Sequence, residues 1–189
     1  NLPDCSNMCH ESSGVALEAT IGIGKGSVTL DDLERSDLIF VVGQNPGTNH
    51  PRMLSTLERA RRNGAAIVAV NPLPEAGLLR FRNPQKVRGV LGSGTALATH
   101  HLQVRVNGDL ALFTLLGRRL LEDGVLDHEF IATHTDGFDE WATHVRATDV
   151  DELLAIAGVP AEQLEEVHRA VSSASSIIVC WAMGLLRGI

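Results

Sequence analysis

The residues of this sequence that are best suited to chemistry are an adjacent cysteine and histidine, Cys9 and His10. A papain-like nucleophilic pair is disfavoured, because the histidine must then reach the sulfur from elsewhere in the fold. Zinc is disfavoured as well, since no second pair of ligands stands at metal-ligand spacing. An inert buried thiol is a further alternative. A thiolate that ligates a soft metal, with His10 as a proton acceptor, fits the two residue types best.

A second group of candidates lies in four loops that carry Gly, Asn or Asp, at residues 43–50, 71–75, 107–109 and 181–184. Each loop follows an apolar run, and in an open parallel sheet ligands bind outside the carboxyl ends of the strands. Asn45 and the amides after it can meet a pyrophosphate at a helix start. Asp109 can accept hydrogen bonds from the N–H edge of a purine. Ordinary turns and helix caps are the alternative explanation of the same residues.

The elements that must position these loops are predicted from apolar runs and cap residues. Strands are expected at residues 38–42, 65–70, 102–106 and 177–181. Helices are expected to follow Ser12 or Ser13 and to cover residues 30–35, 51–62, 110–122, 127–133, 138–145, 149–156 and 161–173. Residues 38–70 form strand, helix and strand, which predicts a right-handed βαβ unit. The expected fold class is α/β, with a Rossmann-like parallel sheet flanked by helices on both faces.

Two segments do not fit this simple alternation. Residues 71–99 form a long connection with four cations, Arg80, Arg82, Lys86 and Arg88, which favours a functional, mobile or partner-facing segment. The glycine-rich run at residues 21–26 follows a predicted helix, whereas a dinucleotide fingerprint follows a strand and opens a helix. A flexible turn is therefore favoured there over a phosphate-binding loop.

Composition limits the broad class of protein. The chain has 189 residues, 44% of them hydrophobic, with a mean hydropathy of +0.07 and a net charge of −7. The acidic balance argues against a general nucleic-acid or membrane-surface binder, and no apolar run approaches the length of a membrane span. Three cysteines do not make a disulfide framework, so a cytoplasmic location is expected.

Taken in order, these residues resemble the molybdopterin oxidoreductases of the DMSO reductase superfamily, and within it the alpha subunits of formate dehydrogenases. The resemblance rests on an ordered set of motifs: Cys9-His10 with Gly14, then Gly24, then residues 36–46 with His50-Pro51, then Asn63-Gly64-Ala65, then residues 107–112, then Trp181-Ala182-Met183-Gly184. Asn71-Pro72-Leu73 stands where many members have Asp-Pro-Arg, and residues 74–99 are longer than usual. With these departures, the sequence resembles a divergent branch of the alpha subunits.

The resemblance implies a bis(molybdopterin guanine dinucleotide) cofactor that carries molybdenum or tungsten. Cys9 would be the metal ligand, and His10 would accept a proton near the substrate. The implied cofactor-binding residues are Gly43, Asn45, Pro46, Asn71, Gly108, Asp109, Met183 and Gly184. Residues 1–189 would then be a single α/β domain, the third of such a subunit, excised from a longer multidomain chain.

The partners implied by the resemblance are a small-molecule substrate, the remaining domains of the same subunit and an electron-transfer partner. An iron–sulfur cluster outside these 189 residues is left open. Two alternatives to a molybdopterin oxidoreductase remain: a Rossmann-type nicotinamide or flavin binder, and a non-catalytic α/β interaction module. Metal in the full-length protein separates the leading hypothesis from both.

Overall fold

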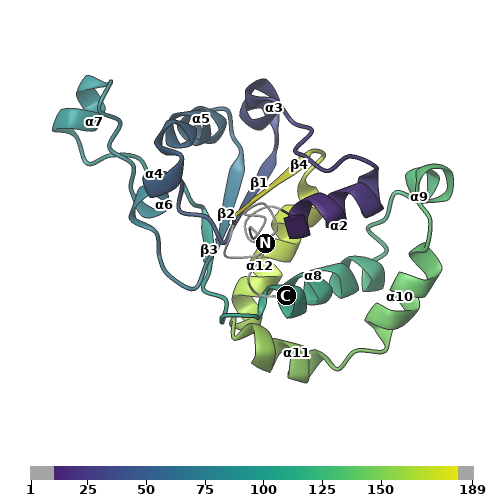
Figure 1. Ribbon diagram of the computed structural model, residues 1–189. Helices are drawn as coiled ribbons and strands as arrows, with labels where there is room; N and C mark the ends of the chain where they lie inside the picture. The colour runs from purple at the N-terminus through teal and green to yellow at the C-terminus, as the bar shows by residue number, and fades with distance from the viewer. Residues whose placement is uncertain (1–10, 183–189) are drawn as a thin grey trace, which may run out of the picture.

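The computed structural model describes residues 11–182 and shows a parallel sheet with helices on both faces (Figure 1). Its strands are β1 (Leu38–Val42), β2 (Ala66–Val70), β3 (His100–Leu102) and β4 (Ile177–Trp181). The helices of the first half are α2 (Glu11–Ile21), α3 (Leu30–Arg35), α4 (Pro46–Asn49), α5 (Pro51–Arg62), α6 (Ala76–Leu79) and α7 (Val87–Leu91). Those of the second half are α8 (Asp109–Glu122), α9 (His128–His134), α10 (Phe138–Arg146), α11 (Val150–Ala157) and α12 (Ala161–Ser173). Within residues 11–182 no helix combines the length and apolarity needed to cross a membrane.

The four strands are parallel and stand in the order β3-β2-β1-β4. From β1 the chain moves outward to β2 and β3 and then returns to place β4 on the other side of β1. The order matches the first four strands of the Rossmann order 3-2-1-4-5-6, and it reverses between β1 and β4. The predicted fold class is therefore confirmed.

The central strands β1 and β2 are buried on both faces, as their continuous apolar runs predict, whereas Ile177 and Val179 of the edge strand β4 are 41% and 42% exposed. Alternate side chains of β1 enter two separate cores, since Leu38, Phe40 and Val42 face one way and Ile39 and Val41 the other. The first core is completed by α8, α11 and α12, and the second by α3, α5 and α6. The strand ends are thus held from both sides, which fixes the loops that follow them.

The predicted third strand is misplaced: the sequence indicates residues 102–106, but β3 spans His100–Leu102. Thr99 leads the chain into the sheet, because its hydroxyl accepts from the Ile67 amide at 3.0 Å and donates to the Ile67 carbonyl at 2.8 Å. Beyond Leu102 the Arg105 N–H donates to the carbonyl oxygen of Ala157 at 2.9 Å. Residues 104–106 therefore leave the sheet towards the end of α11, in spite of their alternating pattern.

Helices α9, α10 and α11 form an arm that packs against α8. Phe138 is half-buried beside the small core made by Leu121, Ala142 and Val145. Trp141 is more exposed and lies over Gly117 of α8, where a Cβ would come within 2.9 Å of the indole ring. The arm thus depends on close helix contacts more than on a large core.

Asp149 caps α11, and its replacement by alanine is expected to loosen that helix. Its carboxylate accepts from the amides of Asp151 at 2.9 Å and Glu152 at 3.0 Å. Losing such a cap costs about 1 kcal/mol, or roughly a fivefold increase in local opening. Hydrogen exchange of the peptide covering residues 150–157 in the full-length protein measures this. Asp151→Ala, in the first turn of the same helix, is the control and should change exchange less.

Candidate functional site

A pocket of about 460 Å³ lies at the carboxyl edge of the sheet, where the loops after β1 and β2 meet the loop before α8. Its lining residues are Gly43, Asn45, Asn49, Asn71, Pro72, Leu73, Glu75, Val106, Asn107 and Asp109. The pocket lies beyond the carboxyl ends of β1 and β2, the edge at which open α/β sheets bind their ligands.

Asp109 is the first residue of α8 and is 9% exposed. No other residue in the described part of the chain donates a hydrogen bond to its carboxylate, and burial raises the pKa of that carboxyl group above its ordinary value. Gly108 makes this placement possible, because a Cβ there would lie 2.9 Å from the Arg105 carbonyl oxygen and 2.9 Å from a methyl group of Val104. The result is a buried acceptor that can take N–H donors from a ligand.

Asn45 and Glu75 join the loops that follow β1 and β2. The Asn45 side-chain oxygen accepts from the Thr48 amide at 3.1 Å and so caps α4, while its amide nitrogen donates to the Glu75 carboxylate. The two loops also approach closely through glycines, since a Cβ at Gly77 would lie 3.3 Å from the Gly47 Cα. This connection fixes one wall of the pocket before any ligand binds.

Gly43 and Asn71 occupy the first position after β1 and β2. Gly43 has a positive φ of 58°, and its N–H still donates to the Val70 carbonyl at 2.8 Å. Asn71 is buried, and its side-chain oxygen accepts from the Leu73 amide at 3.1 Å, which turns the chain away from the sheet. Both residues therefore shape the floor of the pocket.

The charge of the pocket limits its ligand. Two carboxylates line it, Glu75 and Asp109, and none of the described residues that line it is Lys, Arg or His. Such a lining favours uncharged groups that donate hydrogen bonds, such as a purine edge or sugar hydroxyls, over phosphates. The lining therefore agrees better with the prediction that Asp109 contacts a purine than with the prediction that Asn45 contacts a pyrophosphate.

Four of the predicted cofactor-binding residues meet in the pocket: Gly43, Asn45, Asn71 and Asp109. Pro46 and Gly108 do not line it, because Pro46 is buried at the start of α4 and Gly108 packs under α8. Cys9, His10, Met183 and Gly184 lie outside the described residues. Sequence inspection missed Glu75 as a partner of Asn45, and no local pattern indicates a contact between residues so far apart.

Sulfur chemistry has one further candidate in the described part of the chain. Cys180 lies in β4 as a free thiol, and burial raises its pKa to about 11. It is therefore protonated at neutral pH and is a poor ligand or nucleophile. Within residues 11–182 no group of three or more His, Cys, Asp or Glu side chains is arranged to hold a metal ion. The predicted metal ligand therefore remains Cys9.

The relatives of this chain include oxidoreductases. No family model matches the chain. It is 53% identical over 193 residues to the uncharacterized oxidoreductase Rv2900c of Mycobacterium tuberculosis H37Rv, and 44% identical over 198 residues to protein YdeP of Escherichia coli K12. Both alignments cover 99% of this chain. Formate dehydrogenase H of Escherichia coli K12 is 27% identical over 187 residues, again across 99% of the chain.

The predicted resemblance to formate dehydrogenase-like molybdopterin oxidoreductases is confirmed. The chain spans about a quarter of the length of these relatives, since it covers 25% of Rv2900c and 24% of formate dehydrogenase H. Among solved structures, acetylene hydratase from Pelobacter acetylenicus superposes with a TM-score of 0.74 over 95% of this chain and 22% of its own. At 19% identity this likeness shows a shared fold.

Proposed function

We propose that the chain is part of a molybdenum- or tungsten-dependent oxidoreductase and holds the guanine end of a bis(molybdopterin guanine dinucleotide) cofactor. The observation that carries this proposal is the pocket in which Gly43, Asn45, Asn71 and Asp109 meet, where no other described residue donates a hydrogen bond to the Asp109 carboxylate. The similarity to formate dehydrogenases over nearly the whole chain supports the same cofactor class.

The pocket has the hydrogen-bonding groups that guanine requires. The base presents N–H donors on neighbouring ring and amino nitrogens, and one carboxylate can accept from both. Asp109 is suited to this role because it is buried and other described residues leave it unpaired. Glu75 is the second carboxylate of the lining and can accept from sugar hydroxyls. The phosphates of the cofactor would then lie beyond this acidic pocket.

The remaining residues are assigned by relatedness. Cys9 would bind the metal through its thiolate, and His10 would accept a proton released from the substrate at an imidazole nitrogen. Pro46 and Gly108 would act by shaping the backbone under the pocket, while Met183 and Gly184 would follow β4 along the same dinucleotide. When bound, the metal centre supplies two-electron oxidation or reduction of a small molecule, and formate is one candidate substrate.

Metal and nucleotide analysis of the purified full-length protein tests this proposal. We expect molybdenum or tungsten by mass spectrometry, together with guanine nucleotide released by acid at about two per metal ion, since the cofactor carries two dinucleotides. Protein that is catalytically active without either metal contradicts the proposal. Tightly bound nicotinamide or flavin in place of guanine nucleotide would instead favour a Rossmann-type nucleotide binder.

A further inference from the structure

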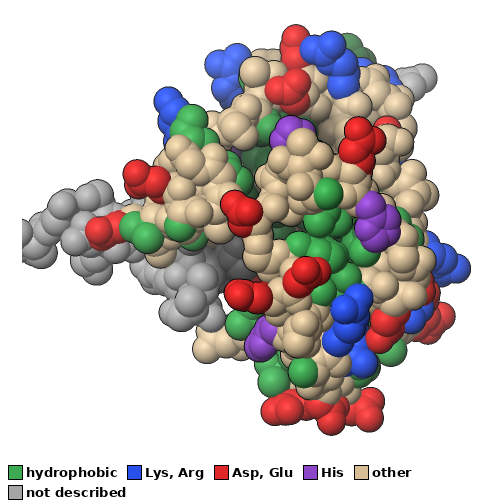
Figure 2. All heavy atoms as spheres, turned by 90° about the vertical axis from the view of Figure 1, so that its right-hand side faces the viewer, with side chains coloured by type: hydrophobic (Ala, Val, Ile, Leu, Met, Phe, Trp, Pro, Cys, Tyr) green, Lys and Arg blue, Asp and Glu red, His purple; other side chains and the backbone are tan. Residues whose placement is uncertain are grey.

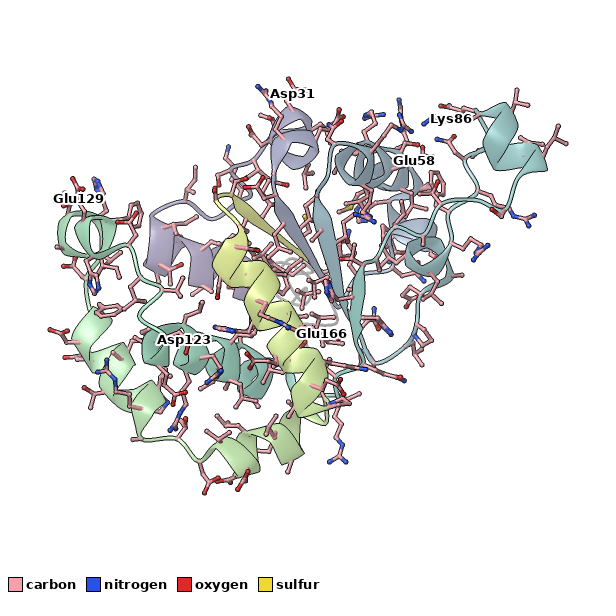
Figure 3. The ribbon with its side chains drawn as sticks, turned by 180° about the vertical axis from the view of Figure 1, so that it is seen from behind. Asp31, Glu58, Lys86, Asp123, Glu129 and Glu166 are labelled. Atoms are coloured by element: carbon pink, nitrogen blue, oxygen red, sulfur yellow. The ribbon has the colours of Figure 1, made fainter. Side chains whose placement is uncertain are left out.

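Residues 76–99 form a positively charged projection, named here the basic excursion. They contain four of the 16 Lys and Arg residues of the chain and none of its 23 Asp and Glu residues. Figures 1 and 3 show the segment that bears α7 extending away from the sheet, beyond α5 and α6. A cationic projection on a chain of net charge −7 indicates a surface that meets an acidic partner.

The basic excursion is anchored to the body of the molecule. Glu58 of α5 is buried and accepts from the Lys86 ammonium at 2.7 Å and from the Asn83 side-chain amide at 2.9 Å (Figure 3). The outgoing and returning segments of the basic excursion are joined by reciprocal backbone hydrogen bonds of 2.8 Å between Phe81 and Thr95. These contacts hold the base of the projection in place, which lowers the entropy cost of docking.

The end of the basic excursion is apolar. Val87 and Leu91 of α7 are 76% and 84% exposed, and Val90 beside them is exposed as well. These three aliphatic side chains have no packing partner in the described part of the chain. Their burial against another surface would add hydrophobic stabilisation to the attraction between charges.

Negative charge is concentrated at the end of α8 and on the helices of the arm. Residues 122–152, named here the acidic arm, contain ten of the 23 Asp and Glu residues and one of the 16 Lys and Arg residues. Phe130 of α9 is 55% exposed, and Trp141 of α10 is also exposed. Figure 2 shows acidic side chains over the face of the molecule on which α9 and α10 lie. The acidic arm thus offers negative charge with aromatic side chains among it.

The two surfaces lie at opposite ends of the molecule, as both Figure 1 and Figure 3 show for α7 and α9. A single molecule cannot bring them together without breaking its core. We propose that the basic excursion of one copy docks on the acidic arm of a second copy. Such a contact joins different surfaces of the two molecules, so it builds a head-to-tail assembly and not a symmetric pair.

Complementary variants of the full-length protein test this contact. The excursion variant carries Arg82→Glu and Leu91→Glu, and the arm variant carries Glu129→Lys and Glu140→Lys. These side chains are exposed and form no ion pair with other described residues. The control, Arg35→Glu with Ile21→Glu, makes the same charge change as the excursion variant on α3 and α2. Circular dichroism checks that every variant is folded.

Light scattering with sedimentation then gives the mass of each protein and of their mixture. We expect the wild type and the control to associate, and each variant alone to associate at least about tenfold more weakly. An equal mixture of the two variants should form a 1:1 complex that grows no further, because one unaltered excursion and one unaltered arm remain. Raising salt from about 0.05 M to about 0.5 M should weaken every complex. A wild type that stays monomeric, variants that associate like the wild type, or a mixture that does not associate would each overturn the proposal.

Discussion

Replacing Cys9 by alanine in the full-length protein is expected to abolish turnover, while replacing Cys180 by alanine should leave it nearly unchanged. A metal-bound thiolate is part of the reacting centre, so its loss should exceed the roughly 10- to 100-fold that loss of an outer partner of a metal site typically costs. Cys180 is a matched control because burial raises its pKa to about 11, which keeps its thiol protonated and unreactive.

Three measurements make the Cys9 prediction specific. Turnover with an artificial electron acceptor gives activity, mass spectrometry gives the molybdenum or tungsten content, and released guanine nucleotide gives cofactor retention. We expect Cys9→Ala to lose activity while most of its guanine nucleotide remains, because the nucleotide pocket is built from other residues. Full activity of Cys9→Ala would show that the thiolate is not a metal ligand. Loss of activity in Cys180→Ala would indicate that β4 contributes to turnover.

The sheet and most helices could be predicted because their signals are local. The apolar run at residues 38–42 is buried on both faces, and Asp149 caps α11 through amides two and three residues further along the chain. The third strand was misplaced for a tertiary reason. Residues 102–106 have a strand-like pattern, but the backbone N–H of Arg105 donates to the carbonyl oxygen of Ala157, which is 52 positions away in the sequence. No periodicity in residues 102–106 reports that contact.

The candidate site could be predicted only as far as a topological rule reaches. The loops that carry Gly43, Asn71 and Asp109 were expected at one edge because they follow apolar runs, and the family resemblance then implied these residues. The link between Asn45 and Glu75 could not be predicted, since it depends on how closely two loops approach. The predicted role of Gly108 in cofactor binding stays a prediction, and the structure adds that Gly108 packs closely against residues 104 and 105.

Asp109→Ala is expected to weaken retention of guanine nucleotide by the full-length protein about 10- to 100-fold. Hydrogen bonds to a charged acceptor contribute about 1.5–3 kcal/mol to binding. The Asp109 carboxylate is available for them, because no other described residue donates a hydrogen bond to it. Guanine nucleotide and metal per protein, measured after extended dialysis, check this result. Asp31→Ala is the control, because Asp31 also lies in the first turn of a helix and is exposed (Figure 3).

Acidity should have a graded effect on the same contact. Because burial raises the pKa of Asp109, its carboxylate becomes protonated at a higher pH than an ordinary aspartate and then stops accepting from a purine. Nucleotide retention is therefore expected to fall as pH drops through that raised pKa, and Asp109→Asn should remove this dependence.

The stability of the cofactor-free protein should depend on pH in the opposite direction. The buried carboxylate of Asp109 destabilises the fold above its pKa, so Asp109→Asn should be at least as stable as the wild type at neutral pH. Thermal unfolding of cofactor-free protein separates the two effects, and a variant that loses both nucleotide and stability would indicate a structural role for Asp109.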